Sequence, residues 1–236
     1  MYEAVLFDMD GVIVDTEHSV TEFWQRLARS EGFSIAPDDL ERHVYGHRAD
    51  HTLRELFPRI SPDQYGEVYR RLRENQESLR YTAIPGVLRL LAELSDARVP
   101  VALVTGAQDW KAAEVLGQLD LAETFDVLIC ADDVALGKPH PACYLLAAER
   151  LSAAIDDCLV FEDAISGVTS AVTAGAACVA LAAPHRAAQV VEAGASTVVR
   201  DFERISFDPY EHLLRVGDQT GFPFASAHES RYLRAN

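Results

Sequence analysis

The chain has 236 residues, enough to bury the hydrophobic core of one or two domains. It carries 37 acidic and 21 basic residues, a formal net charge of −16, so we expect neither a nucleic-acid partner nor an anionic membrane surface. No apolar stretch approaches the length of a membrane span, and no secretory signal is visible. The four cysteines lack C-x-x-C spacing, which is typical of buried thiols and indicates a reducing cytoplasm.

The first predicted element is a short apolar run over residues 4–7, typical of a buried strand in a parallel sheet. Asp8, Asp10 and Gly11 follow where this run stops, and ligands of open α/β sheets bind at that end of the strands. Residues i and i+2 of a strand face the same side, so the two carboxylates would converge and favour a cation between them. Magnesium suits such oxygen ligands and usually arrives with a substrate phosphate. The same residues are also common in a simple turn.

The next stretch, residues 16–81, has helical periodicity throughout. Its apolar residues recur at spacings of three and four, which predicts a small helical bundle inserted after the first strand. One of its helices begins with a recognisable signal: Ser61 at the N-cap, Pro62 at the first helical position and Gln64 placed for a capping box.

From residue 82 onward, apolar runs alternate with helical patterns, which predicts a doubly wound parallel α/β sheet. The expected strands cover residues 99–104, 127–129, 159–161, 178–181 and 197–199. Beyond residue 206 the periodicity is lost and several glycines and prolines appear. We therefore expect residues 207–236 to form a loosely attached C-terminal extension, with an interface arm as the alternative.

Further polar groups follow three of the later strands. Thr105 and Gly106 end one strand, Lys138 precedes a predicted helix, and Glu162 and Asp163 follow another strand directly. Taken singly, each could have a purely structural role: Thr105 and Gly106 as a turn, Lys138 as a solvated lysine and Asp163 as a helix cap. The carboxyl ends of parallel strands meet at one edge of a sheet, however, so we expect these groups to share one crevice with the first two aspartates.

The ordered set Asp8-Met9-Asp10-Gly11, Thr105, Lys138 and Glu162-Asp163 resembles the haloacid dehalogenase superfamily. The runs Phe161-Glu162-Asp163-Ala164-Ile165-Ser166-Gly167 and Asp15-Thr16-Glu17 are similar to those of its β-phosphoglucomutase-like phosphatases. The resemblance reaches from residue 1 to about 206. It implies a Rossmann-like core domain over residues 1–15 and 82–206, with a helical cap domain over residues 16–81.

The resemblance implies that Asp8 is the nucleophile, forming an aspartyl-phosphate, and that Asp10 is the general acid/base. The chemistry agrees, because a carboxylate is already ionised at neutral pH and needs no base to activate it. The resemblance also implies roles for the other strand-end groups. Thr105, Gly106 and Lys138 would hold the phosphoryl oxygens, and Mg²⁺ would bind Asp8, the backbone carbonyl of Asp10 and Asp163, with Glu162 in or near its shell.

Within the superfamily, Asp10 separates phosphatases and phosphomutases from dehalogenases and phosphonatases, which lack an aspartate there. The mutase pattern has a lysine where Tyr45 stands, an arginine where Ala49 stands and a histidine where Val20 stands. We therefore predict a magnesium-dependent phosphatase acting on a small phosphorylated metabolite such as a sugar phosphate. A phosphosugar mutase and a catalytically idle binding protein are the alternatives.

The expected substrate loop of the cap contains His47 and Arg48, which we predict to contact the substrate. A polar loop at a helix junction would have the same composition. The sequence does not identify the substrate, and it is compatible with a monomer or a homodimer.

Overall fold

The computed structural model describes residues 1–77, 79–217 and 220–225. Its centre is a six-stranded parallel sheet with the strand order β3-β2-β1-β4-β5-β6. The strands are β1 (Ala4–Phe7), β2 (Val101–Val104), β3 (Val127–Ile129), β4 (Cys158–Glu162), β5 (Ala177–Leu181) and β6 (Thr197–Val199). The predicted strands and the doubly wound fold class are confirmed. The strand order reverses between β1 and β4, so a ligand crevice is expected at their carboxyl ends.

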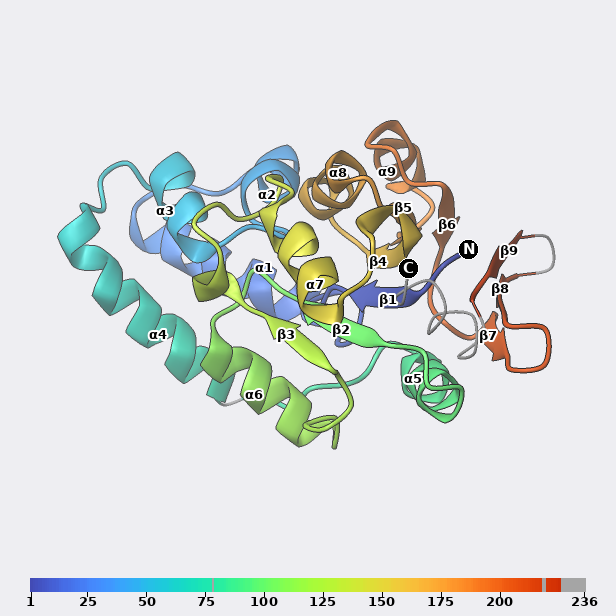
Figure 1. Ribbon diagram of the computed structural model, residues 1–236. Coiled ribbons are helices and arrows are strands. Elements are labelled where there is room, and N and C mark those ends of the chain that lie inside the picture. Colours follow the sequence, from blue (N-terminus) through green and yellow to red (C-terminus); the bar gives the residue numbers. More distant parts are fainter. Residues whose placement is uncertain (78, 218–219, 226–236) are drawn as a thin grey trace.

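Helices cover both faces of this sheet (Figure 1). Helices α5 (Val87–Asp96) and α6 (Asp109–Gln118) pack on one face, and α7 (Ala142–Leu151), α8 (Ile165–Ala174) and α9 (Ala187–Glu192) pack on the other. Side chains alternate along β1 to serve both layers: Val5 and Phe7 belong to the α5–α6 side, whereas Ala4 and Leu6 belong to the α7–α9 side. Short 3₁₀ turns, η2 (Ala131–Asp133) and η3 (Ile155–Asp157), lie in the connections.

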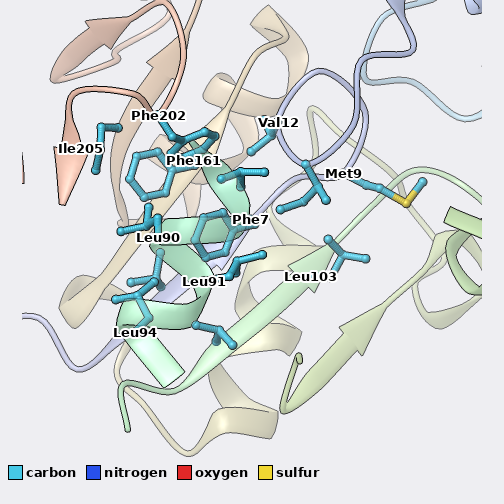
Figure 2. Packing of buried hydrophobic residues seen from close by; sticks show 14 of the residues in the cluster. Phe7, Met9, Val12, Leu90, Leu91, Leu94, Leu103, Phe161, Phe202 and Ile205 are labelled. Carbon is cyan, nitrogen blue, oxygen red and sulfur yellow. The ribbon is translucent and has the colours of Figure 1, made fainter. Parts of the chain in front are cut away.

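The end of β1 is fixed by an aromatic cluster. Figure 2 shows Phe7 beside Phe161 and the leucines of α5. The rings of Phe7 and Phe161 stack with centroids 5.3 Å apart, and Phe202 meets Phe161 edge-on at 5.0 Å. All three residues are fully buried, and each such side chain contributes about 1.5–3 kcal/mol. This packing holds β1 and β4 in register at the edge where their acidic residues begin.

The predicted helical insert is present between β1 and α5. It consists of α1 (Glu17–Ser30), α2 (Pro37–His43), α3 (Ala49–Leu56), the 3₁₀ turn η1 (Pro62–Gln64) and α4 (Tyr65–Glu77). The insert buries a separate hydrophobic cluster that includes Trp24, Leu53 and Phe57. The predicted capping box is confirmed, because the backbone N–H of Ser61 donates to Gln64 Oε1 at 3.0 Å. The helix that follows this capping box begins with the 3₁₀ turn η1, which leads directly into α4.

The prediction of a loosely attached extension from residue 207 is wrong for the part that the structure describes. Strands β7 (Ile205–Asp208), β8 (Leu213–Val216) and β9 (Thr220–Pro223) form an antiparallel sheet. Its apolar side chains, Phe207, Phe222 and Phe224 among them, join the core on the α5 side. The strands are only four residues long and are separated by glycine and proline, which hid their alternation. Residues 226–236, including Tyr232, lie outside the described residues.

The β7–β9 sheet is also tied to both the N-terminus and α5. The Tyr2 N–H donates to the Pro223 carbonyl at 2.8 Å, and Ala225 donates back to Tyr2 at 2.8 Å. From α5, the Arg89 guanidinium donates to the Ile205 carbonyl at 2.7 Å. Among the helices described, none is both long and apolar enough to cross a membrane.

Candidate active site

A cavity of about 310 Å³ lies between the carboxyl ends of the parallel strands and the helical insert. This volume is in the range of small-molecule sites. Most of the predicted site residues line it: Asp8, Asp10, Thr105, Gly106 and Asp163 from the core, with His47 and Arg48 from the insert. Lys138 and Glu162 lie behind Asp8, where they are 5% and 0% exposed. The structure therefore brings every residue predicted for the site into one region.

A buried ion-pair network centred on Lys138 lies behind Asp8. Its ammonium donates to Asp8 Oδ1 at 2.5 Å, to Glu162 Oε1 at 2.6 Å and to the Val104 carbonyl at 3.1 Å. The Tyr144 hydroxyl, from α7, also donates to Glu162 Oε1 at 2.8 Å. Three acceptors use the three N–H donors of the ammonium, so the lysine is held rigidly beside the predicted nucleophile.

The second oxygen of Glu162 organises the turn after β4. Glu162 Oε2 accepts hydrogen bonds from the backbone N–H groups of Asp163 and Ala164, at 3.0 and 3.2 Å. Asp163 in turn lies against Gly11, which has a φ of +79°. A Cβ at Gly11 would be 2.2 Å from Asp163 Oδ2, so only glycine allows both the turn and this approach.

Three carboxylates, those of Asp8, Glu162 and Asp163, can each place an oxygen within 4.8 Å of the others. Burial raises the pKa of Asp8 to about 8, with Lys138 opposing and Glu162 adding to the shift. Burial likewise raises the pKa of Asp163 well above its ordinary value. Burial acts to lower the pKa of Lys138, but the two neighbouring carboxylates outweigh it and the net shift is upward. One lysine therefore faces three acids, and burial by itself favours the protonated form of Asp8 at neutral pH, contrary to the expectation that it is already ionised. A divalent cation with hard oxygen ligands, such as Mg²⁺, fits this group of acids and would favour their ionised forms.

The Asp10 side chain is held by a different set of partners. Thr16 donates to Asp10 Oδ1 at 2.5 Å, and the Lys111 ammonium contacts Oδ1 at 2.6 Å and Oδ2 at 2.8 Å. Lys111 is 6% exposed and lies in the first turn of α6. The sequence analysis missed this residue. A signal existed, because the chain has only two lysines, Lys111 and Lys138, among its 21 basic residues, and both are buried at this site.

Hydrogen bonds of backbone N–H groups fix the loop after β2. The Thr105 N–H donates to the Ile129 carbonyl at 2.8 Å, and Thr105 Oγ1 accepts a hydrogen bond from the Ala107 N–H at 3.0 Å. The acceptor role leaves the hydroxyl proton of Thr105 available to a ligand in the cavity. Gly106 lines the cavity next to it, so both groups stand where the sequence places them.

On the insert side, the loop residues His47 and Arg48 border the cavity. The His47 ring stacks on His51 with centroids 4.1 Å apart. Burial, reinforced by His51, lowers the pKa of His47 to about 4, so its imidazole is neutral at pH 7. Arg48 pairs with Asp50 at 3.3 Å and donates to the Val134 carbonyl of the core at 3.2 Å. The hydrogen bond to Val134 attaches the loop to the core.

The family model of haloacid dehalogenase-like hydrolases matches residues 2–175 of this chain. The chain belongs to this family. A validoxylamine A 7'-phosphate phosphatase from Streptomyces hygroscopicus subsp. limoneus is 33% identical over 202 residues, which cover 82% of this hydrolase and 92% of that protein. A phosphorylated carbohydrates phosphatase from Thermotoga maritima is 37% identical over 177 residues, covering 73% and 82%. The predicted family and the predicted enzyme class, a phosphoric monoester hydrolase, are confirmed.

A solved structure, the β-phosphoglucomutase of Clostridium difficile, resembles this hydrolase with a TM-score of 0.74 at 24% identity. The likeness covers 88% of this chain and 94% of that one. At this identity it concerns the fold alone, which is the predicted Rossmann-like core with inserted helices.

A second residue that the sequence analysis missed connects the insert of this hydrolase to its core. Arg186, which follows β5 and is 6% exposed, pairs with Glu41 at 2.9 Å and Glu17 at 3.5 Å. It also donates to the Asp163 carbonyl at 3.2 Å. Arg186 is one of many arginines in the sequence and lies in a loop, and no local sequence pattern distinguishes it.

Proposed function

We propose that this hydrolase is a magnesium-dependent phosphatase that releases phosphate from a small phosphorylated metabolite through an aspartyl-phosphate on Asp8. The observation that carries the proposal is the Lys138 ammonium held behind Asp8, 2.5 Å from its Oδ1. A nucleophilic carboxylate beside a fixed cation is what phosphoryl transfer requires, since its catalysis is mainly positioning and charge neutralisation. The names of the two relatives support a carbohydrate-like metabolite.

In the first step, a carboxylate oxygen of Asp8 forms a bond to phosphorus while the bond between phosphorus and the leaving oxygen breaks. The Thr105 hydroxyl and the Gly106 N–H would bind the phosphoryl oxygens, and the charge of the Lys138 ammonium, whose three N–H groups are already used, would offset theirs from behind Asp8. Asp8 stays fixed during the transfer, because its backbone N–H donates to the Phe161 carbonyl at 2.9 Å.

Asp10 is the proposed general acid/base. Its carboxyl group gives a proton to the leaving oxygen and then takes one from the water that attacks the aspartyl-phosphate, which restores Asp8 and releases phosphate. Thr16 and Lys111 orient the carboxylate of Asp10, which is not part of the group formed by Asp8, Glu162 and Asp163. With its carboxylate oriented by these partners, Asp10 can transfer the proton while Asp8 attacks.

The proposed magnesium ligands are the carboxylates of Asp8 and Asp163 and the backbone carbonyl of Asp10. When bound, the ion would neutralise phosphoryl oxygens and the excess negative charge of the acids. Glu162 already accepts four hydrogen bonds, two at each oxygen, so its main proposed role is to hold Lys138 and the turn that presents Asp163.

The proposal can be tested with phenyl phosphate and a panel of sugar and polyol phosphates. The wild type is expected to release phosphate only when magnesium is present. Asp8→Asn is expected to lower the rate by about 1,000-fold or more, because it removes the nucleophile. Asp96→Asn, an exposed aspartate at the end of α5, is the matched control and is expected to leave the rate unchanged. Asp8→Asn turnover above a tenth of the wild-type rate would contradict the mechanism.

The reaction product distinguishes the proposed phosphatase from the mutase alternative. Glucose 1-phosphate is incubated with a trace of glucose 1,6-bisphosphate, and both glucose 6-phosphate and free phosphate are followed. A phosphatase yields free phosphate, whereas predominant glucose 6-phosphate would favour the mutase.

We also propose the division into a core domain over residues 1–15 and 82–206 and a cap domain over residues 16–81. The separate buried cluster of the insert supports it. A cytoplasmic location is proposed because all four cysteines, which lie within the described residues, are buried free thiols.

A further inference from the structure

The insert side of the cavity contains a polar group that the proposed chemistry does not use. Gln76, near the end of α4, lines the cavity and is only 5% exposed. Its side-chain Oε1 is buried and has no hydrogen-bond partner among the described residues. Buried amide oxygens are almost always hydrogen-bonded, so an unpaired one at a cavity wall indicates a missing ligand group.

Apart from Glu17, the other residues of α1 and α4 that line the cavity are apolar or aromatic. Val20, Trp24, Tyr69 and Leu72 line the same cavity from α1 and α4. Trp24 is fixed in place, because its ring packs against Phe57 with centroids 5.7 Å apart. Such a wall suits the carbon skeleton of a ring or chain, and a single amide among apolar groups suits one hydroxyl placed against it.

The charges that border the cavity exclude a second phosphate. Of the described residues that line it, the two cations are Arg48 and Lys111, and each is already paired with a carboxylate, at 3.3 Å from Asp50 and 2.6 Å from Asp10. His47 is neutral at pH 7, as its lowered pKa requires. Other lining residues add negative charge. A second phosphate on the substrate would therefore lack a cationic partner here.

We propose that Gln76 determines specificity by hydrogen-bonding a hydroxyl of an uncharged leaving group whose carbon skeleton lies against Val20, Trp24 and Leu72. The substrate class is then a monophosphate ester of a neutral, hydroxylated compound, and a bisphosphate is a poor substrate. This inference rests on the proposed phosphatase function. It adds to that proposal the residue that recognises the leaving group, and it states that the leaving group is uncharged.

The test compares Gln76→Leu with the wild type on two kinds of leaving group. The hydroxylated probes are glucose 6-phosphate, sorbitol 6-phosphate and glycerol 3-phosphate, of which the best substrate of the wild type is used. Phenyl phosphate is the probe whose leaving group carries no further hydroxyl. Gln189→Leu, an exposed glutamine on α9 far from the cavity, is the matched control.

For Gln76→Leu we expect kcat/KM on the hydroxylated probe to fall about tenfold or more. The variant cannot form the hydrogen bond to the substrate hydroxyl, and a site that binds a hydroxyl in this way discriminates strongly through that hydrogen bond. On phenyl phosphate the change is expected to stay within about twofold, which also shows that the variant is folded and its phosphoryl chemistry intact. Glucose 1,6-bisphosphate is expected to be at least tenfold poorer than glucose 6-phosphate with the wild type.

An equal loss on both kinds of probe, or no loss on the hydroxylated one, would overturn the role of Gln76. A bisphosphate turned over as well as the monophosphate would overturn the uncharged leaving group. These outcomes differ from failure of the proposed function, in which the wild type would release no phosphate from phenyl phosphate or from any member of the panel.

Discussion

The two sides of the cavity differ in how fully their polar groups are paired. On the core side, Lys138 has three acceptors and Glu162 has four donors, all within 3.2 Å. On the insert side, Gln76 Oε1 and His47 Nδ1 are buried without a hydrogen-bond partner among the described residues. The groups proposed for phosphoryl transfer are therefore preorganised by the protein, whereas the groups proposed to face the leaving group are left to pair with a ligand.

The largest effect is expected from replacing Lys138, the centre of the ion-pair network on the core side. Lys138→Met removes the cation next to Asp8 and leaves Glu162 buried beside it without its partner. We expect the rate of phosphate release to fall by about 10²–10³. We also expect the free energy of unfolding to fall by about 3–5 kcal/mol, because breaking a buried ion pair leaves an uncompensated charge.

Steady-state kinetics on phenyl phosphate and urea unfolding measure the two effects of Lys138→Met separately. An activity within tenfold of the wild type would show that the core network is structural and does not serve the phosphoryl group.

A smaller effect is expected from Lys111→Met, which removes the bidentate partner of Asp10. Asp10 keeps its hydrogen bond from Thr16 but loses its fixed orientation, so we expect kcat to fall by about 10–100-fold. KM is expected to change by less than about twofold, since Lys111 is already paired and is not proposed to bind the substrate. Arg71→Met, the loss of an exposed cation on α4, is the control. A large rise in KM with unchanged kcat would instead make Lys111 a substrate ligand.

The smallest effect is expected in the pH dependence of stability. The pKa of Asp8 is raised to about 8 in the folded protein, so folding favours its protonated form. Stability is therefore lost as pH rises from the ordinary carboxyl range toward about 8. With a chelator present, we expect Tm to fall by about 3 °C or more between pH 6 and pH 9.

The proposed magnesium site requires ionised carboxylates, so addition of magnesium is expected to raise Tm more at pH 9 than at pH 6. Thermal unfolding followed by circular dichroism checks both expectations, and Asp8→Asn is expected to reduce the pH dependence. The same Tm shift by magnesium at both pH values would contradict the assignment of Asp8 to the metal site.

Much of the core side could be predicted because its signals are local. Asp8, Lys138 and Asp163 each follow a strand or precede a helix within a few residues, and the parallel topology brings such ends together. The insert side could be predicted only as a helical bundle. Which face of α4 borders the cavity depends on how the insert packs on the core, so Gln76 gives no sequence signal.

The six parallel strands, the helical insert and the residues of the proposed phosphoryl site could all be predicted from the sequence, because short periodic runs and strand ends encode these features locally. The pairing of Lys111 with Asp10, the pairing of Tyr144 with Glu162 and the β7–β9 sheet became visible only in the folded chain. The fold also places Gln76 Oε1 in a buried position where no hydrogen-bond partner is found among the described residues. In each case the partners are far apart in the chain or the strands are very short, so packing against the core fixes where the side chains point.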